Sequence, residues 1–586
     1  MSIKTNRRKA EHTPSILPEK LRTLSFFGKI PEVVITAHLL PLLTNGALGA
    51  LAGTEKGISG VVGEFRHKTI DWDWDAILRD TNGTAPPLLG LVKRLRNVRE
   101  LDLGMLPHEN KLQYLHIRQK GPINCTLLPH GLIGLVISPF SSHYMDNATP
   151  IFDDENPQLP ATLRTLTLRD GYNRAIGRSL SQTNIERITV GRYYDRKFED
   201  GSLPSTLTEL HLMRYAQPLG MVLAKTNLNT LEIWGDYNHA FPPGSLPRSL
   251  SRVCLLGGYN QPLGQVLSQT NLSYLCLGSY DCEIERGALP ASLEELYLVG
   301  GYNHPFPRGV LPRGLCKLHL GNSYNQPFAK NSLPVSLREL NIGNGYTHAF
   351  PPGELRRTEL TVLCLGSGYD EELGKESLPN TLKELYLTGY TKEFTHGVLS
   401  NSWLEILHLV AYNHQFQSGV LPDTLQELHL TGYNKELTPG VLSKTRLVSL
   451  SLDDFDQTLH PGALPDTLEK LEMNRYRKKL PPGVLPNTRL RYLRLDEFDQ
   501  ILHRESLPHT LEKLDMNGYS KELPPGLFSN TQLKYLRLGE LFDHKIHPGS
   551  LPDTLETLCL GQSYNQPILL SAISNTRLKL IMGGRG

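Results

Sequence analysis

The sequence predicts a solenoid of stacked repeats with a parallel β-sheet on one face and mostly non-helical returns. The first observation is a period of about 22 residues, clearest between residues 246 and 332, which is typical of repeat proteins. The second is a Leu-x-x-Leu-x-Leu segment in each row, which ends in alternating apolar and polar residues. The third is a stretch rich in Pro and Gly after each segment, which disfavours an α-helix.

Each repeat is expected to contain one short strand. In Leu293 to Leu298, the last four residues have the period of two that is typical of a strand with one buried face. A strand of about five residues cannot bury its leucines alone, so we expect neighbouring copies to stack about 4.8 Å apart. After the strand, Gly257-Gly258 and Gly300-Gly301 are expected to give the backbone the freedom that a turn requires.

A Tyr-Asn-x-Pro turn follows many of these strands, for example at Tyr302 to Pro305 and Tyr324 to Pro327. We expect the asparagine to satisfy backbone groups at the turn and the proline to keep the return extended. These rows resemble FNIP repeats, a class similar to leucine-rich repeats, whose signature in this turn is Phe-Asn-Ile-Pro. Here Tyr replaces Phe, and Gln or His replaces Ile. The resemblance implies a leucine-rich-repeat-like solenoid of the kind found in amoebae and in the large DNA viruses that infect them.

The rhythm is regular from Leu163 to Leu560, which predicts about 19 rungs. Three irregular rungs are expected before it, at residues 98–103, 112–117 and 132–137. Rows of the form Leu-Pro-x-Thr-Leu often alternate with rows of the form Ser-x-Thr-x-Leu. The array therefore grew partly by duplication of pairs of rows, about 43 residues at a time.

The region before the repeats has a helical rhythm, because apolar residues recur three and four positions apart between residues 30 and 68. We expect a small α-helical region of about three short helices there. It resembles an F-box, whose pattern is matched at Ile30, Pro31, Val34, Leu40, Leu43, Leu48, Leu51 and Lys56. The tryptophan that usually follows the basic residue is absent, since Gly57-Ile58 stand there. The resemblance implies that these eight residues bind a Skp-type adaptor of a cullin ubiquitin ligase.

These patterns suggest an order of domains and two functional hypotheses. We expect a disordered tail over residues 1–15, the F-box-like helices over 16–70, a linker with irregular first repeats over 71–158, and the FNIP-type solenoid over 159–586. The first hypothesis is a substrate-recognition subunit of a Skp–cullin–F-box ubiquitin ligase. The alternative is a repeat scaffold without a ubiquitin role, in which the N-terminal helices only cover the open end of the leucine core.

The composition limits the kinds of partner and the cellular location that we expect. The chain has 61 Lys and Arg against 59 Asp and Glu, so its net charge gives no reason to expect nucleic acid. The sequence has no apolar run long enough for a membrane span and no secretory signal, so we expect no membrane partner. The seven cysteines suggest no disulfide framework, because four occupy one outward strand position. We therefore expect a cytoplasmic protein (host cytoplasm if viral), with the nucleus as a possible location.

The outward strand positions are the candidate binding face, because their residues vary where the leucines do not. The central outward column is aromatic and polar in its middle part, a composition found at protein interfaces. The expected target-binding residues are Trp234, Tyr297, His319, Tyr386, His408 and His429. The later alternation of Glu472, Arg494, Asp515 and Arg537 is expected to be a self-satisfied ladder of charges.

Catalysis and cofactor binding are not expected. His408 and His429 fall on adjacent rungs, but the two rings lack a nearby carboxylate or cysteine, so we expect no metal site. The sequence has no phosphate-binding glycine loop, no nucleophile elbow and no His-Glu-x-x-His or Cys-x-x-Cys motif. We therefore expect no cofactor and a non-catalytic protein whose target protein the sequence does not name.

Overall fold

The computed structural model describes residues 72–73, 94–99, 103, 112–119, 122–139, 152, 159–568, 570–572 and 578–582. The chain forms two compact units, residues Met1–Leu272 and Ser273–Gly586. The helical elements in these described ranges are short 3₁₀ turns: η6 (Cys125–Leu127), η7 (Arg504–Ser506) and η8 (Leu570–Ala572). The expectation of non-helical returns is confirmed for this part of the chain. The expected F-box helices lie outside the described residues.

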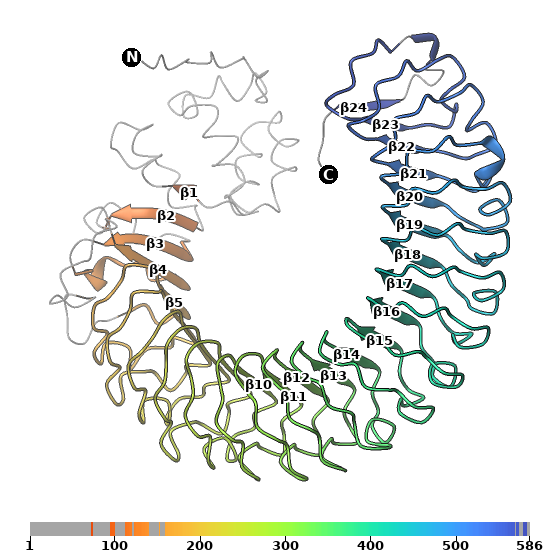
Figure 1. Ribbon diagram of the computed structural model, residues 1–586. Coiled ribbons are helices and arrows are strands. Elements are labelled where there is room, and N and C mark those ends of the chain that lie inside the picture. Colours follow the sequence, from red (N-terminus) through yellow and green to blue (C-terminus); the bar gives the residue numbers. More distant parts are fainter. Residues whose placement is uncertain are drawn as a thin grey trace, which may run out of the picture. The chain divides into compact units, whose positions relative to one another are not determined.

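In the first unit, each strand pairs in parallel with the next one along the chain (Figure 1). The strands are β1 (Trp72–Asp73), β2 (Arg94–Arg99), β3 (Tyr114–Gln119), β4 (Gly134–Pro139), β5 (Thr165–Leu168), β6 (Arg187–Val190), β7 (Glu209–Leu212), β8 (Thr230–Ile233) and β9 (Arg252–Leu255). The repeat pattern does not predict β1.

The second unit has the same organisation, and its strands also pair in parallel in chain order. The strands are β10 (Tyr274–Leu277), β11 (Glu295–Leu298), β12 (Lys317–Leu320), β13 (Glu339–Ile342), β14 (Val362–Leu365), β15 (Glu384–Leu387), β16 (Ile406–Val410), β17 (Glu427–Thr431), β18 (Ser449–Asp453), β19 (Lys470–Asn474), β20 (Tyr492–Asp496), β21 (Lys513–Met516), β22 (Tyr535–Leu538), β23 (Thr557–Leu560) and β24 (Lys579–Met582).

The register of the strands confirms the repeat alignment. Strands β5 to β23 are the 19 regular rungs that the sequence predicts. Within one row, Leu293, Leu296 and Leu298 are 0 to 1% exposed, so the three leucines of the motif form the core. Among the described residues no helix is both long and apolar enough to cross a membrane.

The first irregular rung differs from the prediction. Its strand is β2, residues Arg94–Arg99, rather than residues 98–103. Leu95 pairs with Leu115 of β3, and Val98 pairs with Ile117 after a shift of register. The sequence here offers two overlapping sets of apolar residues, and the structure uses the earlier set with an irregularity that restores the pairing. The other two early rungs, β3 and β4, lie where they are expected.

The turn tyrosines form a second core column on the return side. The rings of Tyr302, Tyr324 and Tyr346 are 0 to 1% exposed, and successive ring centroids lie 6.3 and 6.0 Å apart. The same stacking joins Tyr215 and Tyr237 in the first unit at 6.5 Å. Paired strands lie only about 4.8 Å apart. The wider spacing of the rings therefore bends each unit so that its sheet lies on the concave side, as each unit shows in Figure 1.

The turn asparagines link successive rungs. The amide N–H of Asn325 donates to Asn303 Oδ1 at 2.8 Å, and the N–H of Thr347 donates to Asn325 Oδ1 at 3.0 Å. Aspartate does the same where it replaces asparagine, since the N–H of Asn303 donates to Asp281 Oδ1 at 3.0 Å. The expectation that this side chain satisfies backbone groups is confirmed. The group it satisfies belongs to the next repeat, not to its own turn.

Two kinds of hydroxyl contact explain the alternation of row types. In a Leu-Pro-x-Thr row, Thr381 Oγ1 donates to the carbonyl of Leu360 in the preceding rung at 2.8 Å. In a Ser-x-Thr row, Thr270 Oγ1 donates to the carbonyl of Leu267 in its own return at 2.7 Å. The first contact therefore links two rungs, whereas the second stabilises the return of a single rung.

The glycines after the strands are needed for space. Gly300 does not have a positive φ, but a Cβ built there would lie 1.9 Å from the carbonyl oxygen of Gly278 in the preceding rung. The expected role, freedom at a turn, is therefore wrong for this residue. Close approach of two backbones excludes any side chain there. The neighbouring Gly301 has its nearest contacts at 3.6 Å, which a methyl group tolerates.

We predict that Gly300→Ala lowers the free energy of unfolding by about 2 kcal/mol, because the new methyl group pushes two rungs apart. Gly301→Ala, one residue along, is the matched control and should change stability by less than about 0.5 kcal/mol. Denaturant unfolding followed by circular dichroism measures both values. Equal effects of the two substitutions would contradict the backbone contact.

We predict that Tyr324→Phe keeps or raises stability by up to about 1 kcal/mol. The hydroxyl of Tyr324 is buried without a hydrogen-bond partner, and burial raises its pKa well above the ordinary value. Removal of an unpaired buried hydroxyl is nearly neutral or stabilising. Tyr324→Ala should instead cost about 3 kcal/mol, because it empties a stacked position. A clear loss of melting temperature in Tyr324→Phe would show that the hydroxyl has a partner.

Candidate protein-binding face

The outward column predicted from the sequence is a real column of the sheet. Within the second unit, Tyr297 pairs with His319, Tyr386 pairs with His408, and His408 pairs with His429. Asn341 and Cys364 fill the two rungs between these groups. Five of the six expected target-binding residues therefore lie in one line on β11 to β17. We call Tyr297, His319, Tyr386, His408 and His429 the aromatic segment.

The rings of the aromatic segment contact one another along the sheet. The centroids of Tyr297 and His319 are 4.5 Å apart. Those of Tyr386 and His408 are 5.8 Å apart, and those of His408 and His429 are 5.5 Å apart. Each ring packs against its neighbour because parallel, in-register pairing places equivalent side chains directly beside one another. The segment thus presents two groups of partly exposed rings.

Carboxylates in the adjacent outward column hold these rings in place. The hydroxyl of Tyr297 donates to Glu295 at 3.0 Å, and that of Tyr386 donates to Glu384 at 3.0 Å. His319 Nε2 lies 2.7 Å from Glu339 Oε1. Burial and the hydrogen bond to Glu384 together raise the pKa of Tyr386 to about 12. These contacts order the rings, and side chains that are already ordered lose less entropy when a partner binds.

His408 has a lowered pKa and is a neutral imidazole near pH 7. Burial lowers its pKa, and the nearby His429 lowers it further, while Asp453 acts weakly in the opposite direction. In the described part of the chain, no three His, Cys, Asp or Glu residues gather in a group suited to a metal ion.

Trp234 is exposed but does not belong to the aromatic segment. It follows β8 in the first unit and is 44% exposed. The more exposed Trp403, at 64%, was not predicted. It precedes β16 at a position where rows of the same type carry polar residues such as Asn271 and Arg446. The sequence could have indicated Trp403 as a candidate contact residue, because it is an aromatic residue at a repeat position that is polar in other rows.

The charged end of the face pairs mostly within strands. Glu472 lies 3.0 Å from Lys470 on β19, and Arg494 lies 2.7 Å from Asp496 on β20. The expected contact between neighbouring rungs occurs at Asp515 and Arg537, 3.8 Å apart. Burial of Asp515, which is 8% exposed, raises its pKa despite this arginine. Internal pairing leaves little net charge to attract a partner.

The adjacent column at this end adds cation–π contacts. Lys513 Nζ lies 5.4 Å from the ring centroid of Tyr492 and 5.1 Å from that of Tyr535. Lys470 lies 5.7 Å from the same Tyr492 ring. These contacts order the lysines along β19 to β22 and, like the ion pairs beside them, are satisfied within the sheet.

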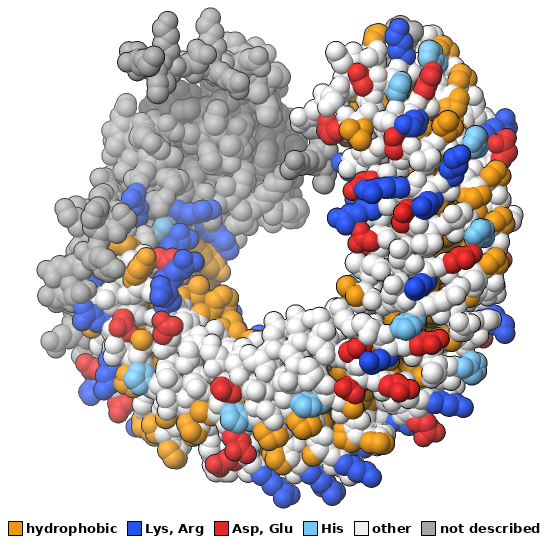
Figure 2. Space-filling view, viewed as in Figure 1, with side chains coloured by type: hydrophobic (Ala, Val, Ile, Leu, Met, Phe, Trp, Pro, Cys, Tyr) orange, Lys and Arg blue, Asp and Glu red, His pale blue; other side chains and the backbone are white. Residues whose placement is uncertain are grey.

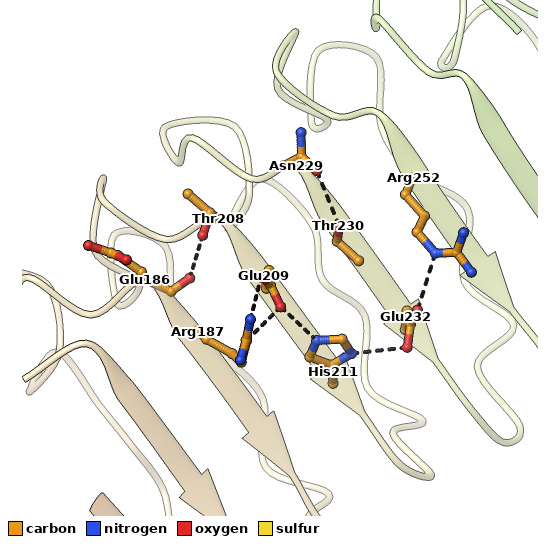
Figure 3. A network of polar contacts seen from close by, with 9 residues as sticks. All are labelled: Glu186, Arg187, Thr208, Glu209, His211, Asn229, Thr230, Glu232 and Arg252. Atoms are coloured by element: carbon orange, nitrogen blue, oxygen red, sulfur yellow. Dashed lines mark hydrogen bonds and ion pairs between the residues drawn. The ribbon is translucent and has the colours of Figure 1, made fainter. Parts of the chain in front are cut away.

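The face of the first unit carries a comparable network (Figure 3). Arg187 binds Glu209 through two nitrogens, at 2.5 and 2.7 Å, and His211 lies 3.0 Å from Glu232. The Arg187 guanidinium lowers the pKa of the Glu209 carboxyl. Arg252 completes the chain at 3.4 Å from Glu232. These charges satisfy one another across β6 to β9.

The cysteines lie at the outward strand position that the sequence predicts, but two of them are buried. Cys254 and Cys276 occupy outward strand positions but are only 6 and 5% exposed. Burial raises the pKa of Cys364 to about 11, so its thiol is protonated near pH 7. None of the seven cysteines forms a disulfide.

The residues expected to bind an adaptor fall in a part of the chain outside the described residues. They are Ile30, Pro31, Val34, Leu40, Leu43, Leu48, Leu51 and Lys56. Their proposed role rests on the sequence pattern alone.

The fold and its uniform parallel rungs define a solenoid of the leucine-rich-repeat type. More particularly, the chain contains FNIP repeats: the family model for the FNIP repeat matches residues 237–300, 302–345, 433–476, 476–519, 519–563 and 542–583. A comparison with curated proteins found no match.

Solved structures support the same class. The chain is similar to CroV588, described as a novel circular LRR protein, with 25% identity and a TM-score of 0.71 over 84% of this chain and 76% of that one. It is also similar to TLR13 in its complex with ssRNA13, with 16% identity and a TM-score of 0.52 over 84% and 74%. The Toll–Spatzle complex of Drosophila matches at 13% identity, with a TM-score of 0.50 over 83% and 68%. The last two show the fold alone.

We predict that His429→Asn raises the pKa of His408, because it removes the second cause of the depression. Folding lowers the pKa of His408, so the folded state favours the neutral imidazole. The stability that His408 contributes is therefore fully present at pH values above the ordinary pKa of histidine, and it is lost as the pH falls below that pKa. Nuclear magnetic resonance titration of ¹³C-labelled histidines measures the shift. An unchanged or lower pKa of His408 in the variant would contradict the contact between the two rings.

Proposed function

We propose that the chain is a non-catalytic protein-binding repeat protein, and that a partner protein docks on the aromatic segment of β11 to β17. The observation that carries the proposal is the line of partly exposed Tyr and His rings, each already packed or held by a carboxylate. Seven rungs span about 30 Å, which suits one side of a standard protein interface of about 800 Å². Aromatic anchors of this kind supply most of the binding energy in such interfaces.

The charge around the segment suggests the chemistry of the partner. The adjacent column carries Glu295, Glu339, Glu384 and Glu427, against Lys317 alone. A carboxylate-lined aromatic strip repels nucleic acid phosphates and favours Lys and Arg side chains. We therefore infer a protein target that presents basic residues between apolar ones. Trp234, on the first unit, is proposed as a separate contact point.

We further propose that residues 16–70 act as an F-box and connect this target to a Skp-type adaptor and a cullin ligase. The support is the sequence pattern and its place before a FNIP array. In this account residues 1–15 are a tail, residues 71–158 join the F-box to the repeats, and residues 159–586 capture the target. The protein acts in the cytoplasm or nucleus of a eukaryotic cell, without metal or cofactor.

A reciprocal pair of variants tests both parts of the proposal. Pro31→Ala with Leu40→Ala should abolish binding of purified Skp adaptor and leave target capture intact. Tyr386→Ala with His408→Ala should lower target affinity by about a hundredfold and leave adaptor binding unchanged. Arg446→Ala, an exposed change in a return segment, is the control for both.

Affinity capture from a eukaryotic lysate, followed by binding measurements on the recovered protein, provides the readout. Adaptor binding that survives the first double variant would exclude Pro31 and Leu40 as the adaptor site. Absence of adaptor binding by the unchanged, folded chain would instead favour a repeat scaffold whose N-terminal region is only a cap. Target binding that survives the second double variant would exclude the aromatic segment as the docking face.

A further inference from the structure

A cavity lined by arginines lies away from the sheet face of the second unit. It has a volume of about 740 Å³ and is bordered by Arg286, Arg308, Arg313 and Arg357. All four residues belong to the returns between strands, so the cavity is separate from the aromatic segment. Figure 2 shows Lys and Arg side chains gathered along the lower edge of the molecule, below β10 to β13.

Basic residues occupy two return positions in these rows. Arg286, Arg308 and Lys330 occupy the same repeat position in three consecutive rows. Arg313 and Arg357 share a second position, where three later rows carry Asp423, Asp466 and Asp553. Other returns also carry runs of like charge, such as Arg477-Lys478-Lys479 and Asp370-Glu371-Glu372, so the cavity and not the charge alone distinguishes these rows.

One arginine of the cavity is built into the fold. Arg357 forms an ion pair with Glu354 at 3.1 Å and also donates to the carbonyl of Leu333. Glu354 is 1% exposed and accepts from the backbone N–H groups of Asn331 and Leu333 at 2.6 and 2.9 Å. The carboxylate fixes the guanidinium and balances its charge. Arg357 therefore lines the cavity with a side chain whose position is fixed by Glu354.

The other three arginines have no such partner. In the described residues, no ion pair involves Arg286, Arg308 or Arg313, and all three side chains are exposed. Arg286 reaches across to the next rung, where its guanidinium atoms come within 3.4 to 3.6 Å of a Cβ built on Gly309. Three arginines without an ion-pair partner among the described residues therefore border one cavity, and its lining contains no Asp or Glu.

The size and charge of the cavity define the class of ligand. Its volume is within the range of small-molecule sites, about 300 to 1,000 Å³. The planar fork of arginine matches phosphate oxygens and binds them through two parallel hydrogen bonds. One phosphate group carries about two negative charges at most, so three uncompensated arginines are matched by two or more groups.

We propose that this cavity binds a small molecule that carries a chain of two or more phosphate groups. Arg286, Arg308 and Arg313 contact the phosphates, and Arg357 is a positioning residue held by Glu354. The site is independent of the protein-binding face, so it stands or falls separately from the proposed function.

Isothermal titration of the full chain with sodium tripolyphosphate, at about 150 mM salt, tests the proposal. We expect saturable one-to-one binding, at least about tenfold tighter than that of inorganic phosphate. Arg308→Gln with Arg313→Gln should weaken it by about tenfold or more. Both side chains are exposed, and equal melting temperatures would show that the variant folds.

Arg504→Gln is the matched control, because Arg504 has the same repeat position as Arg308 in a distant row, and it should leave the affinity unchanged. A second titration with ATP separates the two sources of the ligand: tighter binding than tripolyphosphate identifies a nucleotide, and weaker binding identifies a bare polyphosphate. Absence of saturable binding by both probes, or an equal loss in Arg504→Gln, would overturn the site.

Discussion

The structure depends on one constraint: no rung can bury its own leucines, so each must pair in register with the next. A four-residue strand such as β11 has only two inward side chains, Leu296 and Leu298, and both are covered by equivalent leucines of its neighbours. The Asn303 side chain, the Thr381 hydroxyl and the Tyr324 ring all form contacts one repeat away. Four separate interactions therefore require the same spacing, which explains why the period varies so little.

This constraint separates structure from function within each row. The inward positions, the turn residues and the glycine at position 300 are fixed by contacts to neighbouring rungs. The outward positions are not, and their composition changes along the chain from the ion-paired network around Glu209 to the rings around His408 and the salt bridges around Arg494. The return segments provide a second variable surface, which the arginines around Arg308 use. One fold can therefore carry two unrelated sites.

Much of the fold could be predicted from the sequence, because alignment of the repeats shows which positions are equivalent. The strand positions, the 19 regular rungs and the column that contains Tyr297 and His429 were all predicted by alignment of the rows. The burial of Tyr324 was not predicted, because a residue in a Tyr-Asn-x-Pro turn looks like part of a loop until the rings are seen to stack. The role of Gly300 was misjudged for a similar reason. The close contact between the backbones of two rungs cannot be recognised from the sequence of a single row.

The sites were less predictable than the fold. The aromatic segment was found because its residues share one repeat position. The arginine cavity was missed because Arg286 and Arg313 occupy different positions in different rows and converge only in space. The predicted position of the first strand was wrong, because Leu95 and Leu101 fit the inward position of the repeat equally well. The adaptor-binding residues from Ile30 to Lys56 lie outside the described residues, so that hypothesis remains a prediction.

Hydrogen–deuterium exchange of the intact chain tests the central claim most directly. If side chains of one rung hold the backbone of the next, the turn amides of Asn325 and Thr347 should be protected almost as well as the strand amides of β12 and β13, although both turns lie at the surface. Replacement of Asn303 by Ala should then deprotect Asn325 and leave distant rungs unchanged. Rapid exchange of these turn amides beside slowly exchanging strands would contradict the account, because the rungs would then be joined by the sheet alone.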